Sequence, residues 1–135
     1  MTSGRPRPLD HPTPWSPLDG IPNRLYLEAV RDDDEGLRFL LRGAAPADRA
    51  LRLSFDAPIA YRNINESYRL RTWGARKGEG PWPALSTLER STWVDWLVAE
   101  AGGVIEADAV VHYAIYTPED CVDVASAFPP LAEWL

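Results

Sequence analysis

Few side chains in this sequence are suited to nucleophilic or acid–base chemistry, and they lie far apart along the chain. Its two histidines are His11 and His112, and its single cysteine is Cys121. Glu66 lies in the most polar stretch of a predicted strand, so Glu66 and His112 form a candidate acid–base pair. The same two side chains could instead form a buried polar pair that fixes strand register, or Glu66 could pair with Arg62. The sequence leaves these alternatives open.

The spacing of residues gives no support for metal, cofactor or nucleotide chemistry. One cysteine and two distant histidines match no zinc-ligand pattern, and the acidic run at residues 32–34 lacks the spacing of a calcium loop. The sequence also lacks a glycine-rich loop that follows a strand and opens a helix, and it lacks a Gly-x-Ser-x-Gly turn. Cys121 falls among apolar residues and is expected to be a buried, unreactive thiol. We therefore predict no metal, no cofactor and no catalytic residues, that is, a protein that is not an enzyme.

Two groups of residues are better suited to contact with a partner. The first is the acidic connection between two predicted strands, which consists of Asp32, Asp33, Asp34 and Glu35. The second is Trp73 with Trp82, which bracket a loop rich in glycine and proline. Aromatic side chains on loops are frequent anchors of protein interfaces. The alternatives are a solvated hairpin tip for the acidic group, and ligand stacking or simple loop packing for the two tryptophans.

Length and composition indicate one globular domain, because the 135 residues are 45% hydrophobic and 25% charged. No apolar run approaches the ~20 residues that cross a bilayer, so no membrane segment is expected. The sequence shows no apolar secretion signal and has a single cysteine, so we expect a cytoplasmic protein. The net charge of −6 disfavours nucleic acid as a partner and favours a protein with a basic surface.

Hydrophobic patterns predict the elements that must position these residues. Apolar and polar residues alternate over 24–30, 36–42 and 51–55, which predicts three antiparallel strands, and a bent fourth strand is expected over 59–72. Ser91 is suited to cap a helix that ends at Gly102 and Gly103. A buried central strand is expected over 109–116.

The two ends of the chain carry further signals. The Thr-Pro-Glu-Asp sequence at 117–120 predicts the start of a short C-terminal helix. Six prolines predict that residues 1–22 form a proline-rich extended arm, which Trp15 and Leu18 attach to a single domain at residues 23–135. The predicted class is α+β, with an antiparallel meander of about four strands, a central strand after a helix, and a short C-terminal helix.

Several features occur together in this chain: a three-strand start, Tyr61-Arg62 through Glu66-Ser67, a Trp-bearing helix, and His112-Tyr113-x-Ile115-x-Thr117. In this combination the chain resembles the small bacterial immunity proteins of polymorphic-toxin and contact-dependent inhibition systems. The resemblance implies a non-enzymatic inhibitor that binds a cognate toxin domain, often basic, and blocks its active site. The alternatives are a small enzyme that uses Glu66 and His112, and a structural subunit that packs on a copy of itself through an edge including Trp134. The sequence leaves the oligomeric state open.

Overall fold

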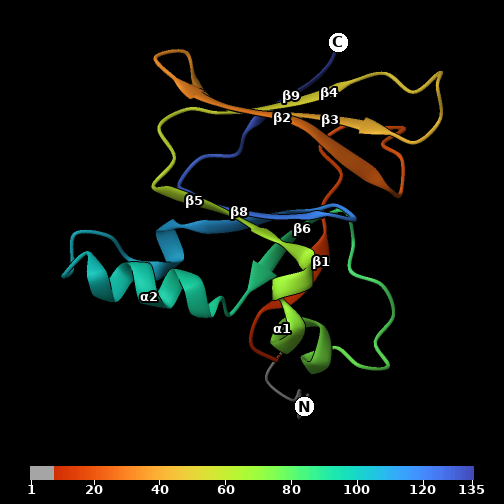
Figure 1. Ribbon diagram of the computed structural model, residues 1–135. Helices are drawn as coiled ribbons and strands as arrows, with labels where there is room; N and C mark the ends of the chain where they lie inside the picture. The colour runs from red at the N-terminus through yellow and green to blue at the C-terminus, as the bar shows by residue number, and fades with distance from the viewer. Residues whose placement is uncertain (1–7) are drawn as a thin grey trace, which may run out of the picture.

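The computed structural model describes residues 8–135, so the first seven residues of the predicted arm lie outside it. The described residues form nine strands in two antiparallel sheets, together with two α-helices (Figure 1). The larger sheet has the strand order β1 (His11–Pro14), β6 (Leu85–Glu89), β7 (Val111–Tyr116), β8 (Asp120–Ser126), β5 (Ala60–Asn65). The smaller sheet has the order β2 (Leu25–Asp33), β3 (Gly36–Gly43), β4 (Leu51–Phe55), β9 (Leu131–Trp134).

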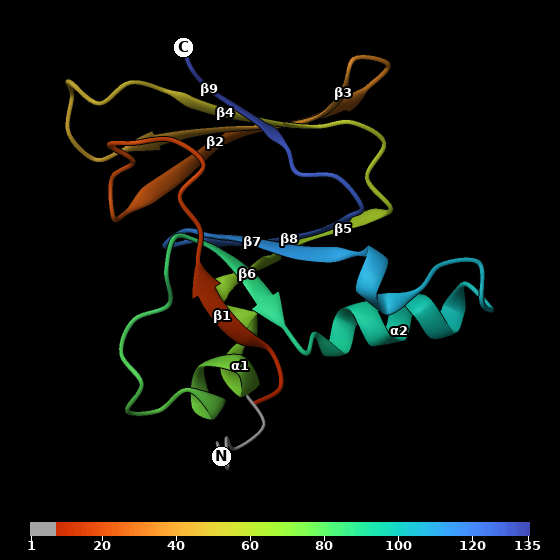
Figure 2. The ribbon, with the colours of Figure 1, turned by 180° about the vertical axis from the view of Figure 1, so that it is seen from behind.

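The elements are stacked in three layers, as the two opposite views make clear (Figures 1 and 2). The two sheets pack face to face. The helices α1 (Leu70–Ala75) and α2 (Thr92–Glu100) lie on the outer face of the five-stranded sheet. Two short 3₁₀ turns, η1 (Glu66–Tyr68) and η2 (Ala107–Ala109), precede α1 and β7 respectively. The fold is therefore mostly antiparallel sheet with a small helical layer.

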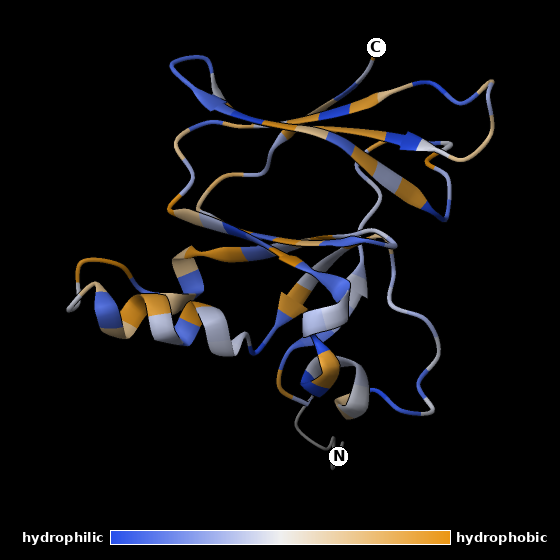
Figure 3. Cartoon of the chain, in the orientation of Figure 1, coloured by the Kyte–Doolittle hydropathy of each residue, from blue (hydrophilic) through white to orange (hydrophobic). Residues whose placement is uncertain are grey.

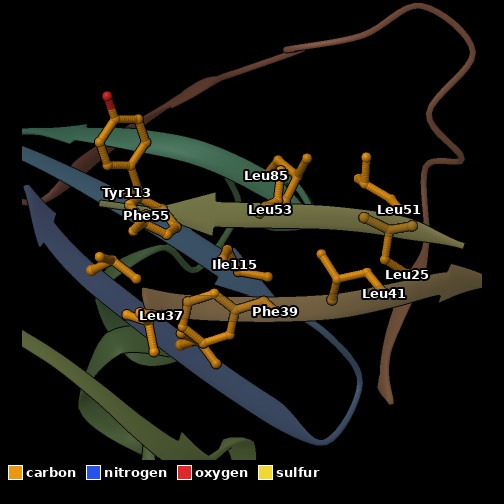
Figure 4. Packing of buried hydrophobic residues seen from close by; sticks show 12 residues of the cluster. Leu25, Leu37, Phe39, Leu41, Leu51, Leu53, Phe55, Leu85, Tyr113 and Ile115 are labelled. Carbon is orange, nitrogen blue, oxygen red and sulfur yellow. The ribbon is translucent and has the colours of Figure 1, made fainter. Parts of the chain in front are cut away.

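The main hydrophobic core lies between the two sheets (Figure 4). The alternation predicted for β3 and β4 places one face of each strand in this core, and Phe39 meets Phe55 edge-on at 5.9 Å. Burial of each such side chain stabilises the fold by roughly 1.5–3 kcal/mol. The fully or nearly fully buried members are Leu25, Leu37, Phe39, Leu41, Leu51, Leu53, Phe55, Leu85, Tyr113, Ile115, Val122 and Val124.

Several predicted elements are confirmed. The first three predicted strands are β2, β3 and β4, and they pair in sequence order. The predicted helix is α2, and the Ser91 side chain caps it by accepting a hydrogen bond from the Val94 amide at 3.0 Å. The predicted central strand is β7, which occupies the middle position of the five-stranded sheet.

The predicted C-terminal helix is wrong, because residues 120–126 form strand β8. The segment 117–120 is the turn of the β7–β8 hairpin, in which the Thr117 amide donates to the Asp120 carbonyl at 2.8 Å. Threonine, proline and acidic residues favour tight turns as well as helix starts. Strand β8 is covered on both faces, so it lacks the alternation that identifies a half-buried strand.

The predicted fourth strand is correct only over its first half. Residues 60–65 form β5, but the chain then turns into η1 and α1, with the Asn65 side chain accepting from the Ser67 amide at 2.9 Å. Strand β5 pairs with β8 in the five-stranded sheet, so the meander of the smaller sheet has three strands, and β9 is the fourth member of that sheet.

The described part of the proline-rich arm is built into the domain. Its residues 11–14 form β1 at the edge of the five-stranded sheet, a position where the missing amide of proline is tolerated. Trp15 and Leu18 pack against the main core, and the Trp15 ring lies 5.1 Å from that of Tyr113.

Candidate functional site

The four acidic residues predicted as a contact lie together at the turn between β2 and β3, and we call Asp32–Glu35 the acidic tip. Arg38 pairs with Asp33 at 2.5 Å and with Glu35 at 3.0 Å. The Asp33 side chain also accepts the Glu35 amide at 2.9 Å. Asp32 and Asp34 are exposed to solvent. Asp33 and Glu35 are therefore held in place by Arg38, and all four carboxylates remain on the surface.

The two predicted tryptophans meet in a second, smaller core on the outer face of the five-stranded sheet. Trp73 and Trp82 contact each other edge-on at 5.9 Å, and Trp82 stacks on Tyr116 at 4.9 Å. The Trp73 indole donates to the Glu66 carbonyl at 2.9 Å. Both rings are half-buried, and they also line an open hollow of about 750 Å³. They are therefore brought together, with part of each ring still accessible.

The structure does not pair Glu66 with His112. The Nδ1 atom of His112 lies 2.6 Å from the Ser91 hydroxyl, and its Nε2 atom lies 2.7 Å from an Asp123 carboxylate oxygen. Both ring nitrogens are therefore occupied by groups other than Glu66. The Glu66 carboxylate instead accepts a hydrogen bond from the Ser67 hydroxyl at 3.3 Å.

Asp123, which the sequence reading missed, is the centre of a buried polar network. Its side chain is fully enclosed, and it accepts hydrogen bonds from His112 and from the Tyr116 hydroxyl, each at 2.7 Å. Arg62 approaches the second carboxylate oxygen at 2.8 Å, and Arg69 approaches it at 3.3 Å. We call the group of Ser91, His112, Tyr116, Arg62, Arg69 and Asp123 the Asp123 network.

The surroundings of Asp123 keep its carboxylate ionised. Burial raises the pKa of Asp123, but the hydrogen bond and charge interaction with His112, followed by the charge of Arg62, outweigh burial and bring the pKa below its usual value. Burial and the nearby carboxylate raise the pKa of Tyr116, so its hydroxyl stays protonated and donates. The network is thus an ionised acid surrounded by donors, which is the condition for a buried charge to be tolerated.

The order Ser91–His112–Asp123 matches the order of groups in a hydrolytic triad. The Nε2 atom of His112 faces the ionised Asp123 carboxylate at 2.7 Å, and its Nδ1 atom faces the Ser91 hydroxyl at 2.6 Å. However, Ser91 is only 7% exposed and its oxygen also accepts the Val94 amide. We interpret the array as a connection that fixes the start of α2 to the sheet.

Cys121 and the side chains that could bind a metal ion are the remaining candidates for chemistry. Cys121 is buried in the smaller core, and burial raises the pKa of its thiol to about 11. Over residues 8–135, no three histidine, cysteine or acidic side chains are grouped to hold a metal ion. Neither α-helix of the described chain has the length and apolar composition needed to cross a bilayer.

The fold and site define a mostly antiparallel two-sheet protein with a helical layer and a buried acid at its polar centre. Comparison of the chain with models of protein families, with curated protein sequences and with solved structures gives no match.

Proposed function

We propose that this protein is a non-enzymatic protein-binding module, and specifically an immunity protein that neutralises a cognate bacterial toxin domain by direct binding in the cytoplasm. The observation that carries the proposal is the acidic tip, a preformed group of four carboxylates at an outer turn of the smaller sheet. The tip is hydrophilic, in contrast to the apolar strands behind it (Figure 3).

The geometry of the acidic tip suits a basic partner. Arg38 holds Asp33 and Glu35 in place before binding, so less conformational entropy is lost on association. A toxin domain that cleaves nucleic acid needs a basic active site to attract phosphates. A rigid row of carboxylates would occupy such a site and steer the two proteins together.

The internal use of the polar side chains supports a binding role over a catalytic one. Both ring nitrogens of His112 are engaged, and Asp123 is saturated by four donors. Both side chains are almost fully buried, which supports a structural role for them. The carboxylates of Asp32 and Asp34, by contrast, are exposed at the acidic tip.

The test begins with the tagged protein as bait in a lysate of the producing cells, followed by purification of the captured protein and measurement of its dissociation constant. The Asp32→Asn/Asp34→Asn variant removes two charges from the acidic tip and leaves the pairs of Arg38 intact. The control variant, Glu106→Gln/Asp108→Asn, removes the same charge from an exposed part of the α2–β7 connection.

The tip variant should weaken binding by about tenfold at low salt, and the difference should shrink at high salt. The control variant should leave the dissociation constant nearly unchanged. The captured protein should also arrest growth when it is expressed alone and should be neutralised by co-expression of this protein. A partner that is harmless when expressed alone, or one that binds the tip variant as tightly as the wild type, would contradict the proposal.

A further inference from the structure

A cavity of about 450 Å³ lies beside the Asp123 network, on the opposite side of the five-stranded sheet from the main core. Its lining comes from β1, β5, β6, β7, α1 and the first residue of α2. Four of the lining residues are arginines: Arg62, Arg69, Arg71 and Arg76. In a chain with a net charge of −6, this is a marked local excess of positive charge. We call this space the arginine cavity.

The acidic residues beside the four arginines offset this charge only in part, because Asp10, Glu79 and the neighbouring Asp123 supply three carboxylates against four guanidinium groups. Asp10 is occupied by the amide and hydroxyl of Thr92, each at 2.8 Å, and Glu79 lies at the rim, 3.5 Å from Arg76. Arg71 is exposed and forms no ion pair or hydrogen bond within residues 8–135. At least one guanidinium group therefore remains available to a ligand.

Arg62 also has donor groups that form no hydrogen bond with the described residues. Arg62 reaches Asp123 through Nε, which leaves its two terminal nitrogens without a hydrogen bond to the described residues. Arg69 differs, because its Nη1 atom donates to Asp123, its Nε and Nη2 atoms donate to the hydroxyls of Thr72 and Tyr116, and its guanidinium lies 5.3 Å from the Tyr116 ring centre. The buried Asp123 thus orients both guanidinium groups at the cavity wall, and the two terminal nitrogens of Arg62 remain available to a ligand.

A buried nitrogen also lacks a partner at this wall. The Nδ1 atom of His11, a lining residue, is enclosed and has no hydrogen-bond partner in the described chain. Such atoms are rare in folded proteins, because an unmade hydrogen bond is costly. The exposed ring of Tyr68 and the half-buried ring of Trp82 add flat apolar surface to the lining.

From these features we propose that the arginine cavity is a binding site for a small organic anion that carries a phosphate or carboxylate group. The planar fork of arginine donates two parallel hydrogen bonds to the oxygens of such groups. The volume is in the range of small-molecule sites, and the aromatic rings accommodate an apolar part of the ligand. The cavity is on the helical side of the molecule and the acidic tip is on the smaller sheet, so this site is independent of the proposed toxin contact.

The experiment is isothermal titration of the full chain with inorganic phosphate in one arm and citrate in the other, at constant ionic strength, with thermal unfolding as a second readout. Arg71→Gln removes the unpaired arginine from the cavity, and Arg24→Gln removes an exposed arginine next to β2 as the matched control. Glu79→Gln removes the competing carboxylate at the rim.

At least one anion should bind and raise the unfolding temperature, and the arm that binds identifies phosphate or carboxylate as the recognised group. Arg71→Gln should weaken binding by about tenfold, Glu79→Gln should tighten it, and Arg24→Gln should change it by less than about twofold. Failure of both anions to bind at several millimolar would overturn the proposal. Equal weakening by Arg24→Gln and Arg71→Gln would also overturn it, because that result indicates attraction to the general surface charge.

Discussion

Replacement of Asp123 by asparagine tests whether the buried network holds the helical layer on the sheet. The substitution keeps the shape of the side chain but removes the charge that faces Arg62 and Arg69. It also places an NH₂ group among four donors, so at least one of them loses its acceptor. The side chain of Arg69 is only 11% exposed, which leaves a guanidinium buried without its counter-ion.

The expected cost follows from this burial. Removal of one partner of a buried ion pair destabilises a protein by about 3–5 kcal/mol. The total stability of a domain is typically about 5–15 kcal/mol, so Asp123→Asn should remove a large share of it. Urea unfolding measures the loss as a lower midpoint with an unchanged slope. Asp120→Asn is the control, because its carboxylate contacts only the Asn63 amide at 3.1 Å near the surface, and it should cost less than about 1 kcal/mol.

The wild type and the Asp123→Asn variant should also differ in their response to acid. The pKa of Asp123 is lower in the folded protein than its ordinary value of 3.8. The stability contributed by its ionised form is therefore fully present above that ordinary value and is lost as pH falls through the lower, folded pKa. The wild type should lose stability steeply below about pH 4, and Asp123→Asn should lose less. A loss of less than about 1 kcal/mol at neutral pH, or identical acid profiles, would refute the account of the network.

Two further predictions concern residues around the smaller core and the start of α2. Burial raises the pKa of Cys121 to about 11 from 9.0. The thiolate fraction of Cys121 in the folded protein should therefore be about a hundredfold lower than that of an exposed cysteine, and its reaction with iodoacetamide should be correspondingly slow. Equal alkylation rates with and without urea, measured by mass spectrometry, would contradict this prediction. The Ser91→Ala variant removes the acceptor of the Val94 amide and the hydroxyl partner of His112. It should lower the free energy of unfolding by about 1–2 kcal/mol and speed hydrogen exchange in the first turn of α2. Unchanged exchange in that turn would count against the capping role.

The strands that could be predicted from the sequence are those with one face exposed to solvent and the other buried in the core. Strands β3 and β4 alternate cleanly because one side faces the core and the other faces water. The same alternation does not say which sheet a strand joins, and this is why β5 was assigned to the wrong neighbours. Two stacked sheets and one larger sheet can present similar local patterns.

Asp123 was missed because its strand was taken for a helix. On a helix that buries Cys121 and Val124, Asp123 would point to solvent, where an acidic residue is ordinary and does not indicate a site. On a strand, Cys121, Asp123 and Ala125 share one face, which the helical layer covers. An acidic residue within a run of β-branched and small residues is the signal that could have identified it. His112 was identified as a polar residue in an apolar strand, but its partner depends on a pairing between β7 and β8 that the sequence pattern did not reveal.

The pairing of distant strands has a consequence for the order in which the protein can form during synthesis. Strand β4 pairs with β9, β5 pairs with β8, and β1 pairs with β6. In each of these pairs the second strand is synthesised much later than the first. Two groups of strands pair with their neighbours in sequence, β2–β3–β4 in the smaller sheet and β6–β7–β8 in the larger one, and the first of them is synthesised earlier. Until the larger sheet forms, the apolar inner face of the β2–β3–β4 meander stays uncovered, and its β4 edge stays unpaired until β9 is made; such surfaces favour association with other chains. We therefore expect the chain to fold more slowly than a helical domain of the same length, because much of its pairing is between strands far apart in sequence.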